Sequence, residues 1–217
     1  MEALRKNENA TREFFQFRMY TCHVNKIKSS CSKEYLDALG NQHGTVKYDR
    51  KEILKDAARI FEDFYGYKSK SFIAPCYTWP INMYKNLKDI GVNYIQGGST
   101  QKIPYQNEKG FKKKRHFTGQ KNKHNQIYIV RNASFEVAEN PSKNWVTNCM
   151  KEIEIAFQYC KPAVISTHRV NFIGEINVKN RDITLSYLKG LLKSILNKWP
   201  EVEFHTTNQL GHIITNE

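Results

Sequence analysis

The sequence of 217 residues predicts an α/β fold, in the form of a parallel β/α barrel or an open sheet. Short apolar segments typical of buried strands alternate with longer segments in which apolar residues recur at helical spacing. Two of the short segments, residues 71–79 and 163–174, run directly into polar and aromatic residues. In parallel α/β folds the carboxyl ends of the strands form the rim on which active sites are built. Both segments are therefore candidates for a functional site.

The alternation is regular from about residue 50. Residues 50–65 predict a helix that ends at Gly66, because glycine readily adopts the left-handed conformation that closes a helix. Its inward face is expected to carry Ile53, Ala57, Ile60, Phe61 and Phe64. The next expected elements are a strand over residues 71–74, a helix over 81–90 closed by Gly91, and strands over 92–96 and 126–131.

The second half of the chain continues this pattern. Ser142 is the expected N-cap of a helix that reaches Tyr159, with an inward face of Trp145, Cys149, Ile153, Ala156 and Phe157. Residues 162–167 predict a buried strand. The remaining elements are a helix capped by Asp182 that carries Leu185, Leu188, Leu192 and Ile195, a strand over 202–204, and a short helix beginning at Thr207.

The first 45 residues fit the pattern less well. A strand over residues 13–24 and a short helix over 32–39 are expected there, but no apolar strand precedes Glu13. We expect one domain over residues 1–217 whose barrel is incomplete at the N-terminus. Exposed strand edges favour pairing with another chain, so a homodimer is a further expectation.

About half of the net charge of +13 lies in one segment. Between Gln101 and His124, eight basic residues stand against one acid, Glu108. We expect residues 100–125 to form a solvated, lysine-rich surface loop. The alternative is a groove for a polyanion, since aromatic residues alternate with the basic ones. No nucleic-acid-binding motif accompanies the charge, so nucleic acid is not the expected partner.

The five cysteines indicate a reducing compartment. Their number is odd and they form no C-x-x-C pair, which favours free thiols in a cytoplasmic protein over a disulfide frame. The polar N-terminus has no apolar leader, and no apolar run is long enough to span a membrane.

Five segments in collinear order carry a resemblance to a known family. They are residues 67–79, 94–98, 131–136, 166–174 and 198–204. Through them the stretch from about Phe61 to Ile214 resembles the polysaccharide deacetylases of the nodulation type, which are carbohydrate esterases. It is most similar to a bacterial branch found among surface-polysaccharide biosynthesis genes. The resemblance implies a deformed β/α barrel that removes N-acetyl groups from sugars.

The resemblance also implies a general acid and a sugar-binding groove. His168 matches the late-strand histidine that returns a proton to the leaving amine, and Arg131 matches a rim residue that orients this acid. The substrate-binding candidates are Pro75, Tyr77 and Trp79 in the groove loop, together with Asn132, Arg169 and Asn171.

The family's metal site is matched only in part. The resemblance implies a divalent ion, with zinc expected, held by one Asp and two His of an H-x-x-x-H motif; the ion polarises the acetyl carbonyl and activates water. The candidate ligands are His23, where Met19 takes the first position of the motif, and His43, where Lys47 takes the second. The Asp-Asp pair of the opening strand has no counterpart.

Two functions therefore stay open. One is a metal-dependent deacetylase, truncated or weakly active, for an N-acetylated polysaccharide or a nucleotide- or lipid-linked sugar. The other is a non-catalytic module that binds a glycan or polyanion through the retained groove and the basic segment. A phosphate-binding turn at Gly97-Gly98-Ser99-Thr100 is a weaker alternative, because it lacks the lysine and the glycine spacing of known phosphate loops.

Overall fold

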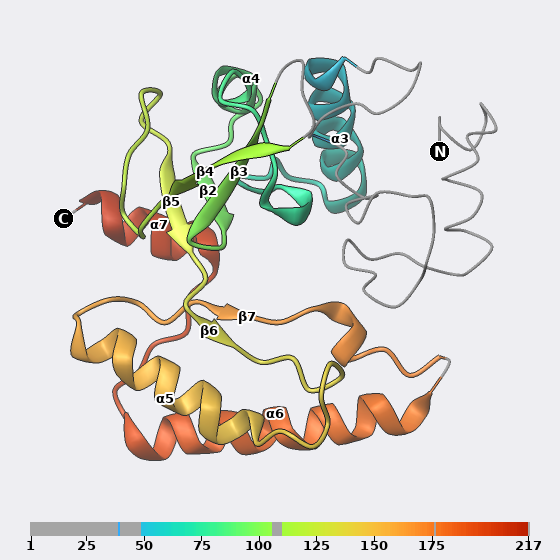
Figure 1. Cartoon of the computed structure of the whole chain (residues 1–217), viewed down its shortest axis with the longest axis vertical. Helices are drawn as coiled ribbons and strands as arrows, with labels where there is room; N and C mark the ends of the chain where they lie inside the picture. Colours follow the sequence, from blue (N-terminus) through green and yellow to red (C-terminus); the bar gives the residue numbers. More distant parts are fainter. Residues whose placement is uncertain (1–38, 40–48, 106–109, 176, 217) are drawn as a thin grey trace. The chain divides into compact units, whose positions relative to one another are not determined.

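The computed structural model describes residues 39, 49–105, 110–175 and 177–216 (Figure 1). Within them the chain has mixed α/β structure with parallel strand pairs and five α-helices, which confirms the predicted class. These residues form sheets of three, two and two strands and no closed barrel, so the barrel stays a prediction. The strand expected over residues 13–24 lies outside the described residues, as does nearly all of the helix expected over 32–39.

The chain divides into two compact units, which are described separately. Among the described residues, the first contains 39, 49–105, 110–116 and 121–127, and the second contains 117–120, 128–175 and 177–216. The expectation of one domain over residues 1–217 stays a prediction.

Helix α3 (Arg50–Tyr65) opens the described part of the first unit at the predicted bounds. The Asp49 carboxylate caps it by accepting the backbone N–H of Lys51 at 2.8 Å, and Gly66 closes it at φ 75°. Its expected inward face is wrong: Leu54 is buried, whereas Ile60 and Phe64 are 57% and 79% exposed. Apolar spacing predicts the helix, but the packing of the rest of the unit decides which apolar stripe is covered.

The sheet of the first unit is built on a β-α-β connection. Strand β1 (Ser71–Ile73) pairs in parallel with β2 (Tyr94–Gly97), and α4 (Met83–Asp89) lies between them in the chain. Strand β5 (Ile127–Val130) follows β2 in the sheet order. Its first residue, Ile127, donates its N–H to the carbonyl of Asn93 at 2.9 Å. These strands confirm the elements expected at 71–74, 92–96 and 126–131, with shorter bounds.

A β-hairpin replaces the loop expected over residues 100–125. Strands β3 (Thr100–Pro104) and β4 (Phe111–Arg115) pair antiparallel, with Gln101 opposite Lys114. Gln101 is fully buried and anchors β3, because its amide donates to the carbonyl of Trp79 and accepts from the hydroxyl of Tyr84, each at 2.8 Å. Lysine is a poor strand former, so the lysine-rich composition of residues 111–115 does not predict the solvent-facing second strand of this hairpin.

In the second unit, two long helices lie on the same side of a short parallel strand pair (Figure 1). The strands are β6 (Ala133–Ser134) and β7 (Ile165–Ser166), and the helices are α5 (Trp145–Gln158) and α6 (Val178–Lys198). The expected inward residues Trp145, Cys149, Ile153 and Ala156 are buried, and the first three belong to the core cluster that these elements share.

The helix starts of the second unit differ from the prediction. Asn144, not Ser142, caps α5 by accepting the N–H of Thr147 at 3.0 Å. Helix α6 begins after Asn177, so Asp182 lies inside it instead of capping it. Several side chains could serve as a cap in each stretch, and the tertiary position of the helix selects among them.

The C-terminal elements are confirmed only in part. The expected strand over residues 202–204 is absent; this stretch lies between α6 and α7 without a strand partner among the described residues. Helix α7 (Thr207–Asn216) begins at the predicted residue.

Candidate functional site

Glu136 and His168 follow strands β6 and β7 at equivalent positions. Ser134 pairs with Ser166 at the strand ends, and the N–H of Phe135 donates to the carbonyl of Ser166 at 2.8 Å, which continues the ladder by one residue. Alternate residues of a strand share a face, so Glu136 and His168 extend on the side of the paired serines. Phe135, which lies between Ser134 and Glu136 in the chain, points to the opposite side and is fully buried in the core. The parallel register thus brings together two residues that are 32 positions apart.

The two side chains form a carboxylate–imidazole pair. The Nδ1 atom of His168 lies 2.6 Å from Oε1 of Glu136, and the side chains are 63% and 15% exposed, respectively. A carboxylate accepting from Nδ1 keeps a proton on that nitrogen. No described residue bonds Nε2, the other ring nitrogen. His168 can therefore exchange a proton at Nε2 with a bound molecule.

The Asn171 side chain binds the second carboxylate oxygen of Glu136. Its Nδ2 donates to Oε2 of Glu136 at 2.7 Å and to the carbonyl of His168 at 2.9 Å, while its Oδ1 accepts the N–H of Ala138 at 2.8 Å. The side chain is fully buried in the 3₁₀ turn η2 (Arg169–Asn171). A fully buried amide with these partners is suited to hold Glu136 in place, and the predicted role of Asn171 in substrate binding stays a prediction.

Arg131 and Asn132 directly precede β6, and Arg169 follows His168 in the chain. Their predicted roles stay predictions. Nη1 of Arg131 donates to the hydroxyl of Ser166 at 3.4 Å. Asn132 donates from Nδ2 to the carbonyl of Pro162 at 2.9 Å, and its Oδ1 accepts the N–H of Val164 at 2.7 Å. Its side-chain amide thus makes the two hydrogen bonds that a backbone amide of a neighbouring strand would make. Arg169 is exposed directly after His168 and is open to a ligand.

Glu136 was not singled out as a site residue from the sequence, although it ends the matched segment 131–136. The signal for it was available. Each of the two segments has a serine at its strand end, one intervening residue and then a residue able to transfer or hold a proton. Recognising the pair requires knowing that these strands are neighbours, which neither segment encodes alone.

The predicted groove residues lie in the first unit. Trp79 is 2% exposed, so its ring belongs to the core and presents no open face to a sugar. Tyr77 ends the turn η1 (Pro75–Tyr77), and its ring lies against Gly97 and Gly98. A Cβ atom on Gly98 would lie 3.1 Å from that ring. The two glycines therefore make room for Tyr77, which accounts for them without a phosphate-binding turn.

The described residues do not form the metal site that the resemblance implies. They contain no group of three or more His, Cys, Asp or Glu side chains able to hold a metal ion. The two histidines predicted as ligands, His23 and His43, lie outside the described residues.

No protein-family model, curated protein or solved structure matches the chain. The deacetylase family, the cytoplasmic location and the homodimer stay predictions. In the part of the chain that the structure describes, no helix combines the length and apolar character needed to cross a membrane.

Proposed function

We propose that this chain is a deacetylase-like hydrolase that removes N-acetyl groups from sugars of a polysaccharide or of a nucleotide- or lipid-linked precursor. The observation that supports it is the contact of 2.6 Å between His168 and Glu136 beyond two parallel strands. His168 acts as the general acid, and Glu136 is the positioning residue that orients it.

Amide hydrolysis needs a proton donor such as the His168–Glu136 pair. Water adds to the acetyl carbonyl, the C–N bond breaks, and the products are acetate and a free amine. An amine nitrogen leaves poorly as an anion, so a proton must reach it as the bond breaks. The protonated Nε2 of His168 supplies this proton, and the ring regains one from the water that has added to the carbonyl; the side chain is 63% exposed, so a bound sugar can reach it. Glu136 keeps the ring in the orientation that turns Nε2 outward and balances the charge of the protonated ring.

Acetate release from N-acetylglucosamine hexamer by the full chain tests this function. We expect His168→Ala to lower kcat by a factor of about 10² to 10⁴, because the loss of a positioned proton donor has effects of this size. Glu136→Gln should also lower kcat. The matched control is His205→Ala, since Nε2 of His205 also lies near a carboxylate, 3.0 Å from Glu203 Oε2. Equal rates in the wild-type protein and His168→Ala would refute the assignment.

The second candidate is a non-catalytic module that binds the same glycans. The observation that favours it is the run of exposed basic residues on β4, which suits binding and has no part in proton transfer. Binding of glycan without acetate release, unchanged in His168→Ala, would support this candidate over the hydrolase.

A further inference from the structure

Helix α6 carries a line of exposed apolar side chains along one face. They are Val178, Leu185, Leu192 and Leu196, and each is between 38% and 52% exposed. Single exposed apolar residues are common on protein surfaces, but these four follow one another at intervals of seven, seven and four positions. Because an α-helix has about 3.6 residues per turn and rises about 1.5 Å per residue, they form one apolar stripe about 27 Å long.

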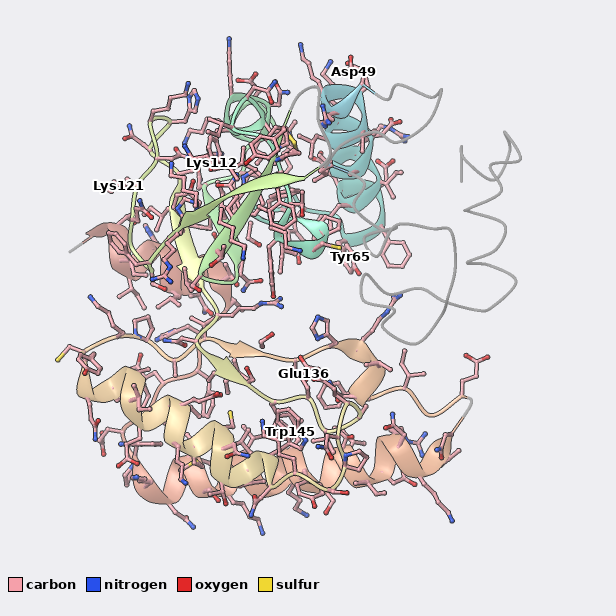
Figure 2. All side chains as sticks on the ribbon, in the orientation of Figure 1. Asp49, Tyr65, Lys112, Lys121, Glu136 and Trp145 are labelled. Carbon is pink, nitrogen blue, oxygen red and sulfur yellow. The ribbon has the colours of Figure 1, made fainter. Side chains whose placement is uncertain are left out.

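The apolar stripe lies on the side of α6 that faces away from α5 (Figure 2 shows the side chains along both helices). Lys198 of α6 binds Glu154 of α5 at 2.6 Å, and a Cβ on Gly190 would lie nearest to Val146 of α5. Positions 190 and 198 are each about 140° from Leu185 around the helix axis. Helix α5 thus covers one flank of α6, and the apolar stripe occupies the other.

The spacing of the apolar stripe suits a helix as its partner. A repeat of seven residues keeps one seam of a helix turned toward a second helix that lies along it, as in a coiled coil. A sheet edge or a small ligand would not require an apolar line of this length. The free flank of α6 therefore offers a second helix the kind of lengthwise contact that α5 makes on the first flank.

The solvent-facing border of the apolar stripe is positively charged. Lys189 and Lys193 are exposed and lie about 40° and 80° from Leu185 around the axis. Neither lysine forms an ion pair with a described residue. The acid within α6, Asp182, is already bonded to Arg181 at 2.9 Å. The border therefore presents two cations whose charge no described acid balances.

This charge distinguishes between possible partners. If two copies of the chain met through the apolar stripe, the same lysines of both copies would border the contact, and like charges across an interface repel each other. A helix with Asp or Glu beside its apolar seam would instead place opposite charges next to Lys189 and Lys193. The net charge of +13 also attracts an acidic partner at long range.

We propose that the apolar stripe of α6 binds an amphipathic helix of a partner protein, whose apolar seam is bordered by acidic residues. Burial of the leucines supplies affinity, and Lys189 and Lys193 favour acidic over basic helices. The stripe lies within the second unit and does not use the His168–Glu136 pair. The inference is therefore independent of the proposed hydrolase.

The test uses two synthetic peptides of about 21 residues, long enough to span the apolar stripe as a helix. Both have leucine in a seven-residue repeat; one has glutamate at the flanking positions and the other has lysine there. Fluorescence anisotropy measures the binding of each labelled peptide to the full chain. We expect the acidic peptide to bind at least about tenfold more tightly than the basic one, and less tightly as salt is added.

The leucine variant shows where the acidic peptide binds. Leu185→Gln combined with Leu192→Gln should weaken its binding about tenfold or more, because apolar side chains at the centre of a contact carry much of the binding energy. The matched control is Ile155→Gln combined with Tyr159→Gln, two exposed positions on and next to α5, which should bind the peptide normally. Equal losses in the two double variants would refute the apolar stripe as the site.

The charge variant tests the kind of partner. Lys189→Glu combined with Lys193→Glu should reduce the preference for the acidic peptide about tenfold or more. The control Lys151→Glu combined with Lys161→Glu makes the same change in net charge at other exposed positions and should keep the preference. An equal change in both variants would mean that net charge alone attracts the peptide, and it would overturn the inference.

Two further measurements complete the test. Light scattering of the full chain gives its oligomeric state, and a dimer that dissociates in the leucine variant would assign the apolar stripe to a second copy and overturn the inference. Circular dichroism shows whether the leucine variant folds. If it does not, the single variant Leu196→Gln replaces it, with a smaller expected loss, and unchanged binding in that variant would refute the site.

Discussion

The buried side chain of Asn171 links the carboxylate of Glu136 to the backbone carbonyl of His168. Its amide supplies donors to a carboxylate and to two further oxygens, and its carbonyl accepts one backbone N–H. Such a side chain fixes the position of the carboxylate and, through it, the direction of the histidine ring.

Asn171→Asp should destabilise the second unit. The change replaces a donor with a second buried acid facing Glu136, and a buried unpaired charge costs about 3 kcal/mol or more. Urea denaturation checks this expectation. The control is Asn144→Asp at the N-cap of α5, where an aspartate caps equally well and the charge favours the helix terminus, so we expect no loss of stability there. Equal destabilisation by the two changes would contradict the positioning role.

Cys149 gives the second unit a pH dependence. Burial, aided by the charge of Glu152, raises the pKa of its thiol from 9.0 to about 12. The folded state therefore holds the proton more tightly than the unfolded state. The resulting stabilisation is complete below pH 9 and is lost as the pH rises from 9 toward 12.

We expect the free energy of unfolding to fall more steeply between pH 8 and pH 10.5 in the wild-type protein than in Cys149→Ala. The difference should be about 1–2 kcal/mol, because each unit of pKa is worth about 1.4 kcal/mol. Urea denaturation at the two pH values measures it. Parallel pH profiles, or alkylation of Cys149 at pH 8 as fast as that of the exposed Cys160, would show that the thiol is not protected.

At the scale of the elements, local signals predicted helices better than strands. The bounds of α3 follow from its two caps: the Asp49 side chain accepts the N–H of Lys51, and the backbone N–H of Gly66 donates to the carbonyl of Glu62. The hairpin was missed because its strands are held by Gln101, whose partners Trp79 and Tyr84 lie 22 and 17 positions away. Strand pairing depends on such distant contacts, whereas a helix bonds within itself.

Gly98→Ala should weaken the packing between η1 and the end of β2. A Cβ placed 3.1 Å from the Tyr77 ring forces that ring to move, and overpacking of this kind costs about 1–3 kcal/mol. Thermal or urea unfolding measures the loss. The control is Gly190→Ala within α6, where the nearest atom is 3.9 Å away and alanine should stabilise the helix by about 0.5–1 kcal/mol. A stabilising Gly98→Ala would show that the ring contact is unimportant.

At the scale of the whole molecule, two kinds of chemistry lie in different compact units. The His168–Glu136 pair belongs to the second unit, and the basic hairpin belongs to the first. Neither unit contains, among the described residues, the metal ligands that the family resemblance implies.

The proposal of a zinc-dependent deacetylase predicts one equivalent of bound zinc in protein purified without chelators. Mass spectrometry of the metal content measures it, and we expect the ion to be lost in His23→Ala or His43→Ala. Acetate release should stop on treatment with a chelator and return when Zn²⁺ is added. The control is His212→Ala, outside the predicted ligand set, which should retain the ion. Full activity after removal of all metal would refute the metal requirement.

The sequence by itself determined the α/β class, the bounds of α3, the start of α7 and the buried face of α5, because helix caps and apolar periodicity are local properties. It also pointed to His168 as a residue of interest. Only the tertiary structure decided that Glu136 is the partner of His168, that Asn171 positions it, and that Lys102 faces Lys113 across a hairpin. The first two depend on the register between strands β6 and β7, which are distant in the chain, and the third depends on a hairpin that Gln101 anchors through distant partners. Packing of the whole unit sets such registers.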